Sequence, residues 1–277
     1  MLEWLFNPAM ASTPVDAERA AAGAELGVSI DLPCGALIVR GAEVPKVKVT
    51  GTIDDPDALS VTTSPGHVSI DVASRFPNRN CAQLEVWVPR AAAVDVETMS
   101  ASLTVEAVTG PVELETISGP ITVTTDGSGV SAESISGAIT VRGAAKRVEA
   151  STVSGAIWLD RVVGPVRVES VSGSIRVVGG GPLPSLSAET VSASVTVAAS
   201  FDPDARVSLE SHSGALVLAL PTSSDTTLTA STLSGAISSA FGPSRGAEHT
   251  LTLGGGRGHV HLETFSGPIA ISRLDPQ

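Results

Sequence analysis

At 277 residues and a net charge of −12, the chain is long enough for one large domain or two ordinary ones. The acidic excess argues against nucleic-acid binding, which needs clustered lysine and arginine, and against adhesion to an anionic membrane surface. Hydrophobic residues make up 42% of the chain and aromatic residues only 3%, which favours thin aliphatic layers over a bulky globular core. There is no run of 18 apolar residues, so no transmembrane segment is expected.

Residues 1–25 are interpreted as an N-terminal tail. Its apolar cluster, Leu2 to Phe6, is too short for a signal peptide, and no basic residues precede it as they would in one. Docking of this cluster on the protein itself is favoured, with a partner or lipid as alternatives. The Ala-rich stretch from Val15 to Ala24 predicts a short helix, because Asp16 and Glu18 would lie in its first turn, where the helix dipole favours acids.

Residues 26–95 are predicted to form a β-strand cap that continues into a repetitive body. Alternating runs such as Val28-Ser-Ile30 and His67-Val-Ser-Ile70-Asp-Val72 are separated by turn clusters around Pro56 and Pro65. A cap is needed because an uncovered terminal turn of a repeat protein would expose apolar side chains and unpaired backbone groups.

The two cysteines, Cys34 and Cys81, each precede a strand-like run, and neither belongs to a Cys-x-x-Cys pair. Two unrelated buried thiols are the favoured interpretation. A disulfide between them is the alternative if the protein is exported.

Residues 96–277 carry an explicit repeat of about 18–21 residues, with a loop insertion expected at 241–258. The phrase Glu133-Ser-Ile-Ser-Gly-Ala-Ile-Thr-Val141 recurs with small changes, and a half-repeat of about nine residues is also visible. Glycine at the corner suits either positive φ or a close approach of two backbones. The repeat corners are Gly119, Gly137, Gly155, Gly173, Gly214, Gly235 and Gly267.

This pattern predicts an all-β, single-chain β-solenoid. Strand side chains alternate between faces, so the residues two and four places after each glycine should point inward together. The expected inward pairs are Ile121/Val123, Ile139/Val141, Ile157/Leu159, Ile175/Val177 and Val195/Val197. The apolar residue before each corner serine is also expected to point inward: Met99, Ile117, Ile135, Val153, Val171, Val191, Leu233 and Phe265, with His212 departing from the column.

One column of acids lies three places before the corner serine: Glu97, Glu115, Glu133, Glu169, Glu189, Glu210 and Glu263, interrupted by Ser151 and Ser231. A solvated outer face that blocks sheet-on-sheet aggregation is the favoured interpretation over a calcium or polycation site, because no Asp-rich loop accompanies it. No metal or cofactor is expected.

The remaining polar candidates are weak. Trp158 beside Arg176 could mark an exposed contact patch, and burial under a loop is an equal alternative. His259 and His261 flank one residue, a spacing that strand alternation explains as well as chelation does. The glycine-rich run Gly254–Gly258 lacks the Lys and Ser/Thr of a phosphate loop and is interpreted as a hairpin tip. No catalytic set can be assigned.

The phrase E-[ST]-[IV]-S-G-x-I-x-V resembles that of the bacterial putative-adhesin domains of unknown function, an adhesin-like β-solenoid family with β-strand repeats. Val28-Ser-Ile30 and Leu84-Glu-Val86-Trp-Val88-Pro89 resemble the family's strands before the repeats, and the resemblance covers roughly residues 26–273. It implies a cell-envelope or secreted location, and the chain is expected to be cytoplasmic if its N-terminus is complete. The family brings no catalytic residues.

The favoured function is therefore a non-enzymatic, adhesin-like structural protein that presents a regular surface to a protein, a glycan or a second copy of itself. A self-assembling intracellular scaffold resembling the bactofilins is one alternative, and open rather than capped ends would favour it. A carbohydrate-active β-helix enzyme is the other alternative, and it would need convergent acids in a groove.

Overall fold

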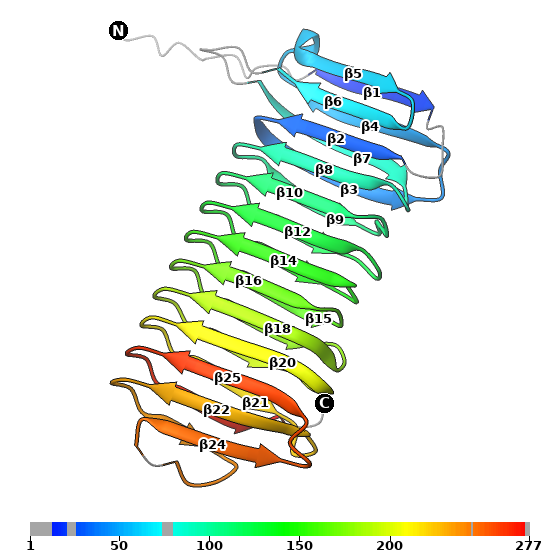
Figure 1. Ribbon diagram of the computed structural model, residues 1–277. Helices are drawn as coiled ribbons and strands as arrows, with labels where there is room; N and C mark the ends of the chain where they lie inside the picture. Colours follow the sequence, from blue (N-terminus) through cyan, green and yellow to red (C-terminus); the bar gives the residue numbers. More distant parts are fainter. Residues whose placement is uncertain (1–12, 21–25, 74–79, 245, 275–277) are drawn as a thin grey trace, which may run out of the picture.

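The computed structural model describes residues 13–20, 26–73, 80–244 and 246–274. The two parallel-stranded sheets of a β-solenoid face each other, and each turn of the chain contributes one strand to each sheet (Figure 1). The predicted fold class is confirmed. The apolar tail Leu2–Phe6 lies outside the described residues.

The first sheet has thirteen strands. In spatial order they are β1 (Thr13–Ala20), β4 (Lys46–Ile53), β7 (Cys81–Pro89), β3 (Cys34–Ala42), β9 (Ser102–Glu106), β11 (Ile121–Thr124), β13 (Ile139–Arg142), β15 (Ile157–Val162), β17 (Ile175–Gly179), β19 (Val195–Ala198), β21 (Leu216–Leu220), β26 (Ile269–Arg273) and β23 (Ile237–Ser239).

The second sheet also has thirteen strands. In spatial order they are β5 (Leu59–Ser64), β6 (His67–Val72), β2 (Gly27–Leu32), β8 (Ala93–Thr98), β10 (Val112–Thr116), β12 (Gly129–Ser134), β14 (Arg147–Thr152), β16 (Val166–Ser170), β18 (Leu183–Thr190), β20 (Phe201–Ser211), β25 (Gly258–Thr264), β22 (Thr226–Thr232) and β24 (Glu248–Leu253). One 3₁₀ turn, η1 (Pro56–Ala58), precedes β5.

The core is a set of aliphatic ladders between the sheets, as the alternating pattern predicts. Each of the five expected inward pairs, from Ile121/Val123 to Val195/Val197, is at most 1% exposed. Because the strands are parallel and in register, like residues stack on like residues: Ile121 pairs with Ile139, and Ile139 with Ile157. Each turn of the solenoid therefore buries its apolar side chains against the turns on either side of it.

Antiparallel strands close both ends of the stack. At the N-terminal end, β5 pairs antiparallel with β6, and β1 with β4. At the other end β24 pairs antiparallel with β22, within the stretch 241–258 that was expected to be a loop. The opposite edge at that end is β23, which has only three residues. Antiparallel covers and short edge strands both limit edge-to-edge pairing.

The predicted helix from Val15 to Ala24 is wrong over the described residues, because β1 occupies Thr13–Ala20. Thr13 faces Ile53 and Ala20 faces Lys46 in the antiparallel pairing with β4. Residues of good helix propensity are held as a strand here because they pair with an otherwise open sheet edge; tertiary context commonly overrides local propensity.

The coils at both ends are intercalated. The coil of β25 and β26 lies between the coil of β20 and β21 and that of β22 and β23, although it follows both in sequence (Figure 1). At the other end, the coil of β2 and β3 lies between those of β6/β7 and β8/β9. The run Gly254–Gly258 is consequently not a hairpin tip: β22 separates β24 from β25, and the run crosses its start, where the Gly258 amide donates to the Asp225 carbonyl.

Cys34 and Cys81 form a disulfide, so the expectation of two unrelated thiols is wrong. The two residues are direct partners at the start of β3 and β7, and their Cα atoms lie 4.7 Å apart. Parallel register places the side chains of direct partners on the same face, which brings the two sulfurs together.

Candidate functional site: an amphipathic groove along the stack

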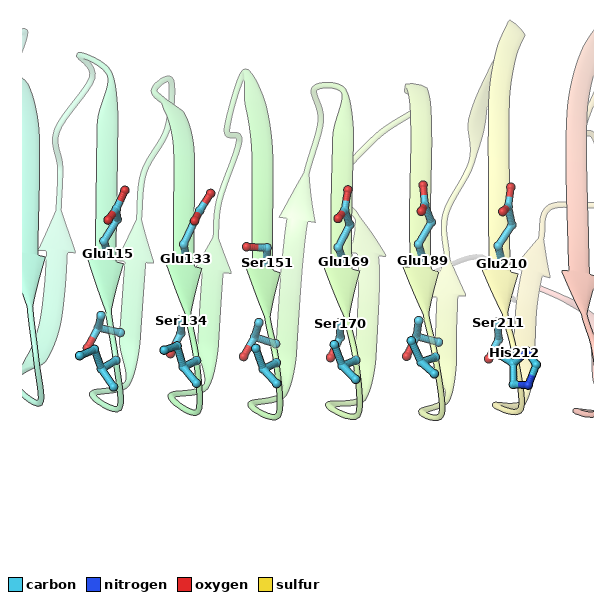
Figure 2. A pocket seen from close by; sticks show the side chains of 18 of the residues that line it. Glu115, Glu133, Ser134, Ser151, Glu169, Ser170, Glu189, Glu210, Ser211 and His212 are labelled. Carbon is cyan, nitrogen blue, oxygen red and sulfur yellow. The ribbon is translucent and has the colours of Figure 1, made fainter.

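A long groove follows one corner of the solenoid, where the second sheet turns toward the first (Figure 2). Its volume is about 1570 Å³, and it extends from Asp71 in the N-terminal cap to Glu248 in the C-terminal cap. One wall is acidic, the other is apolar, and the floor carries hydroxyl groups. We call this surface the ladder groove.

The acidic wall is the predicted glutamate column, and it is longer than the repeats alone indicate. Figure 2 shows the glutamate side chains pointing the same way from successive strands, with the short Ser151 among them. Parallel pairing extends the column to Asp31 and Asp71 at one end, and antiparallel pairing adds Glu248 at the other. The full order is Asp71, Asp31, Glu97, Glu115, Glu133, Ser151, Glu169, Glu189, Glu210, Glu263, Ser231 and Glu248.

The apolar wall is the column that precedes the corner serines, and the prediction that it points inward is wrong. Its eight large side chains are 46–69% exposed: Met99, Ile117, Ile135, Val153, Val171, Val191, Leu233 and Phe265. His212 takes the corresponding place on its own coil, and its ring stacks on that of Phe265 with the centroids 5.0 Å apart. A continuous exposed line of this kind is the sort of apolar patch that marks interaction surfaces.

The side chains of the apolar wall point outward because a hydroxyl residue that points inward precedes each of them in the chain. Ser134 points inward and is buried, and its Oγ accepts a hydrogen bond of 2.7 Å from the Gly137 amide. Thr116 Oγ1 serves the Gly119 amide in the same way at 3.0 Å. A buried amide needs a partner, so the hydroxyl residue takes the inward position, and strand alternation turns the next residue, Ile135 or Ile117, outward.

The corner glycines allow the coils to stack closely. A Cβ placed on Gly137 would lie 1.9 Å from the carbonyl oxygen of Gly119 on the neighbouring coil. A Cβ placed on any of the other corner glycines would lie 1.6–2.0 Å from a backbone carbonyl oxygen of a neighbouring coil: Gly119, Gly155, Gly173, Gly214, Gly235 and Gly267. None of these seven glycines has a positive φ, so close backbone approach is the reason for glycine here.

The charges of the acidic wall are compensated unevenly. Arg167 contacts Glu169 at 2.5 Å, and His261 contacts Glu263 at 3.1 Å. Within the described residues, Glu97, Glu115 and Glu133 form no ion pair, and no lysine or arginine lines the groove. Burial raises the pKa of Glu115, and the charges of Glu133 and Glu97 raise it further. Burial and then the charge of Asp71 raise the pKa of Asp31.

The acids of the groove stand together on one wall, and the facing wall is largely apolar. Glycoside hydrolysis needs two carboxyl groups that flank one bond. Among the described residues, no three histidine, cysteine or acidic side chains are grouped so that they could hold a metal ion, and His261 bonds to Glu263 instead. No helix of the described part is long and apolar enough to cross a bilayer.

Trp158 lies on the opposite sheet and is 45% exposed, so it is not covered by a loop. It is the direct partner of Arg176 on β17, and the guanidinium of Arg142 lies 5.6 Å from the centroid of its ring. The structure therefore brings Trp158 and Arg176 together, away from the ladder groove.

A family model described as Toastrack DUF4097 matches residues 41–272. No curated protein matches the chain. Three solved structures align with the chain over most of its length. A "putative adhesin" from Bacteroides fragilis is 8% identical, with a TM-score of 0.42, and the alignment covers 95% of this chain and 98% of the other. A "putative adhesin" from Parabacteroides merdae is also 8% identical, with a TM-score of 0.41, and the alignment covers 95% of this chain and 96% of the other. A "putative lipid binding protein" from Parabacteroides distasonis is 14% identical, with a TM-score of 0.38, and the alignment covers 95% of this chain and 97% of the other.

Proposed function

The chain belongs to the DUF4097 toastrack family, and from this premise we propose that it is a non-enzymatic, adhesin-like protein that binds a macromolecular partner along the ladder groove. The observation that carries the proposal is the exposed apolar wall, eight large side chains in one line along the stack. Exposing them costs solubility, and a binding partner would remove them from water.

The acidic wall supports specificity for the partner. Ten acids stand beside the apolar line, in a chain of net charge −12, so the groove repels polyanions such as nucleic acids. Charge placed next to an apolar surface steers the correct partner and rejects others. The capped ends favour a separate particle over an end-to-end polymer.

The Cys34–Cys81 disulfide supports a location outside the cytoplasm for this protein, because disulfides persist in oxidising compartments. Protease added to intact source cells tests this location. Cleavage of the protein before lysis is expected. Cleavage only after lysis contradicts it.

Binding of the labelled protein to the surface of source cells tests the function. Replacing Ile117, Ile135 and Val153 by serine is expected to abolish saturable binding. The control variant replaces Trp158 and Val163, which are exposed apolar residues away from the groove, by serine as well. It is expected to bind normally. Equal loss in both variants would contradict binding along the groove, as would full retention in the groove variant.

A further inference from the structure

The N-terminal half of the ladder groove holds a run of five acids that have no basic partner among the described residues. Asp71, Asp31, Glu97, Glu115 and Glu133 follow one another on neighbouring strands, and none forms an ion pair with the described residues. At about 4.8 Å between strands, the run is roughly 20 Å long. Like charges placed directly opposite each other in a sheet are destabilising, and a cation alongside would relieve this.

The same half carries three large exposed aliphatic side chains of the apolar wall. Met99, Ile117 and Ile135 are 53%, 47% and 52% exposed. They stand two residues beyond Glu97, Glu115 and Glu133, a separation of about 7 Å along a strand. A partner that fits this half must therefore present an apolar stripe beside a cationic stripe.

The backbone of the groove excludes one way of binding. Within the turns the amides are already paired with the neighbouring coil: Ile135 donates to Thr116, and Ser136 to Ile117. An extended peptide lying along the groove would find no free ladder to join, and its own backbone groups would be buried unpaired. An α-helix pairs its backbone internally, so only its side chains need a match.

The repeat distances also favour a helix. A helix places side chains on one face about every 5.4 Å, within about 0.6 Å of the spacing between coils, so the mismatch over four steps is about 2.4 Å. An extended chain places them every 6.6 Å or more, and its mismatch over the same span is about 7 Å.

We propose that the N-terminal half of the ladder groove binds an amphipathic, cationic helix of a partner polypeptide. The apolar stripe of the helix packs on Met99, Ile117 and Ile135, and its lysines or arginines lie against Glu97, Glu115 and Glu133. This inference rests on the proposed function and names the chemistry of the partner. The raised pKa values of Asp31 and Glu115 agree with it, because a nearby cation would favour their charged forms.

The probe is a labelled synthetic Leu/Lys peptide of about 18 residues with leucines at helical spacing, long enough to span about five coils. Fluorescence anisotropy with the full chain is expected to show saturable binding that weakens as salt is raised. Circular dichroism is expected to show a gain of helix on binding. A peptide of identical composition with scrambled order is expected to bind at least about tenfold more weakly, because its apolar and cationic stripes are lost.

Two pairs of substitutions locate the site. Glu115→Gln with Glu133→Gln is expected to weaken binding by about tenfold, as is Ile117→Ser with Ile135→Ser. The matched control, Asp95→Asn with Glu113→Gln, removes the same charge from the same sheet outside the groove lining and is expected to change binding by less than about twofold. Cooperative thermal unfolding, at melting temperatures no lower than that of the parent, verifies that the variants are folded.

The inference would be overturned by the absence of saturable binding, by equal binding of the scrambled peptide, or by equal losses in the groove and control pairs. Binding of the protein to anionic lipid vesicles in place of the peptide would also overturn it. If the peptide fails while groove-dependent binding to source cells persists, the helix is the wrong occupant and the proposed function stands. If both fail, the proposed function falls as well.

Discussion

The ring of His212 stacks on the ring of Phe265, 5.0 Å apart and nearly parallel, although the two residues belong to coils that are far apart in sequence. The contact exists because β25 pairs with β20. It covers the coil on which His212 replaces the apolar side chain, so the wall continues through the junction between the regular repeats and the C-terminal cap.

The repulsion within the acidic wall predicts that Glu115→Gln stabilises the protein at neutral pH. Like charges in register cost about 0.2–1 kcal/mol, and Glu115 faces Glu97 on one side and Glu133 on the other. The folded-state pKa of Glu115 is raised, so its penalty is present when the carboxyl is ionised and disappears as the pH falls through that pKa. Thermal unfolding at pH 7 and at about pH 3.5 should therefore show a higher melting temperature for the variant only at pH 7. An equal gain at both pH values would contradict this origin.

The inward and outward isoleucines of one repeat predict different losses of stability for the same substitution to alanine. Ile139→Ala removes a fully buried side chain and should cost about 2–5 kcal/mol of unfolding free energy. Ile135→Ala, four residues earlier and 52% exposed, should stay within about 0.5 kcal/mol of the parent. Chemical denaturation measures both. Similar losses at the two positions would mean that Ile135 points into the core after all.

The corner hydroxyl predicts a loss on Ser134→Ala. The variant leaves the buried Gly137 amide without its acceptor, at a cost of about 1–3 kcal/mol. Ser136 in the same corner is exposed and donates from its Oγ to the Ile117 carbonyl, which also accepts a backbone amide. Ser136→Ala is therefore the matched control, and denaturant titrations should show a much smaller effect. Equal effects would remove the special role of the inward hydroxyl.

The disulfide predicts that the N-terminal cap depends on oxidation. Cys34 and Cys81 are 47 residues apart, and closing a loop of that size stabilises a fold by about 2–4 kcal/mol. Reduction, or Cys34→Ser with Cys81→Ser, should lower the melting temperature and increase amide exchange in β2 to β7 while leaving β10 to β19 protected. Alkylation of either thiol in the native protein without reductant would contradict the bond.

Period-two alternation was sufficient to predict the aliphatic ladders, because a residue such as Ile139 is two places from Val141 on a continuous strand. It failed at the corner. Thr116 and Ile117 are adjacent, one of them must face inward, and hydrophobicity alone selects the isoleucine. The choice is reversed by the Gly119 amide, whose need for a buried acceptor is not visible in a hydropathy pattern.

The sequence therefore predicts only part of the ladder groove. It indicates that the glutamates of the acidic wall form one column, but hydrophobicity alone places the apolar wall in the core. Asp31, Asp71 and Glu248 were missed because strand order at the ends is not encoded by the repeat: β2 precedes β6 in sequence but lies between β6 and β8. The available signal was the match of Val28-Ser-Ile30-Asp31 with Val68-Ser-Ile70-Asp71, two copies that stack directly on each other.

The intercalated C-terminal coil has a consequence for biosynthesis. Residues 258–273 leave the ribosome after residues 201–239, yet their place lies between the coils made of residues 201–220 and 226–239. Before residues 258–273 have emerged, β20 and β22 lack the strand that separates them in the folded protein, so this part of the stack stays incomplete. A chain cut before residue 258 would therefore lack an internal coil of the stack rather than one at its edge.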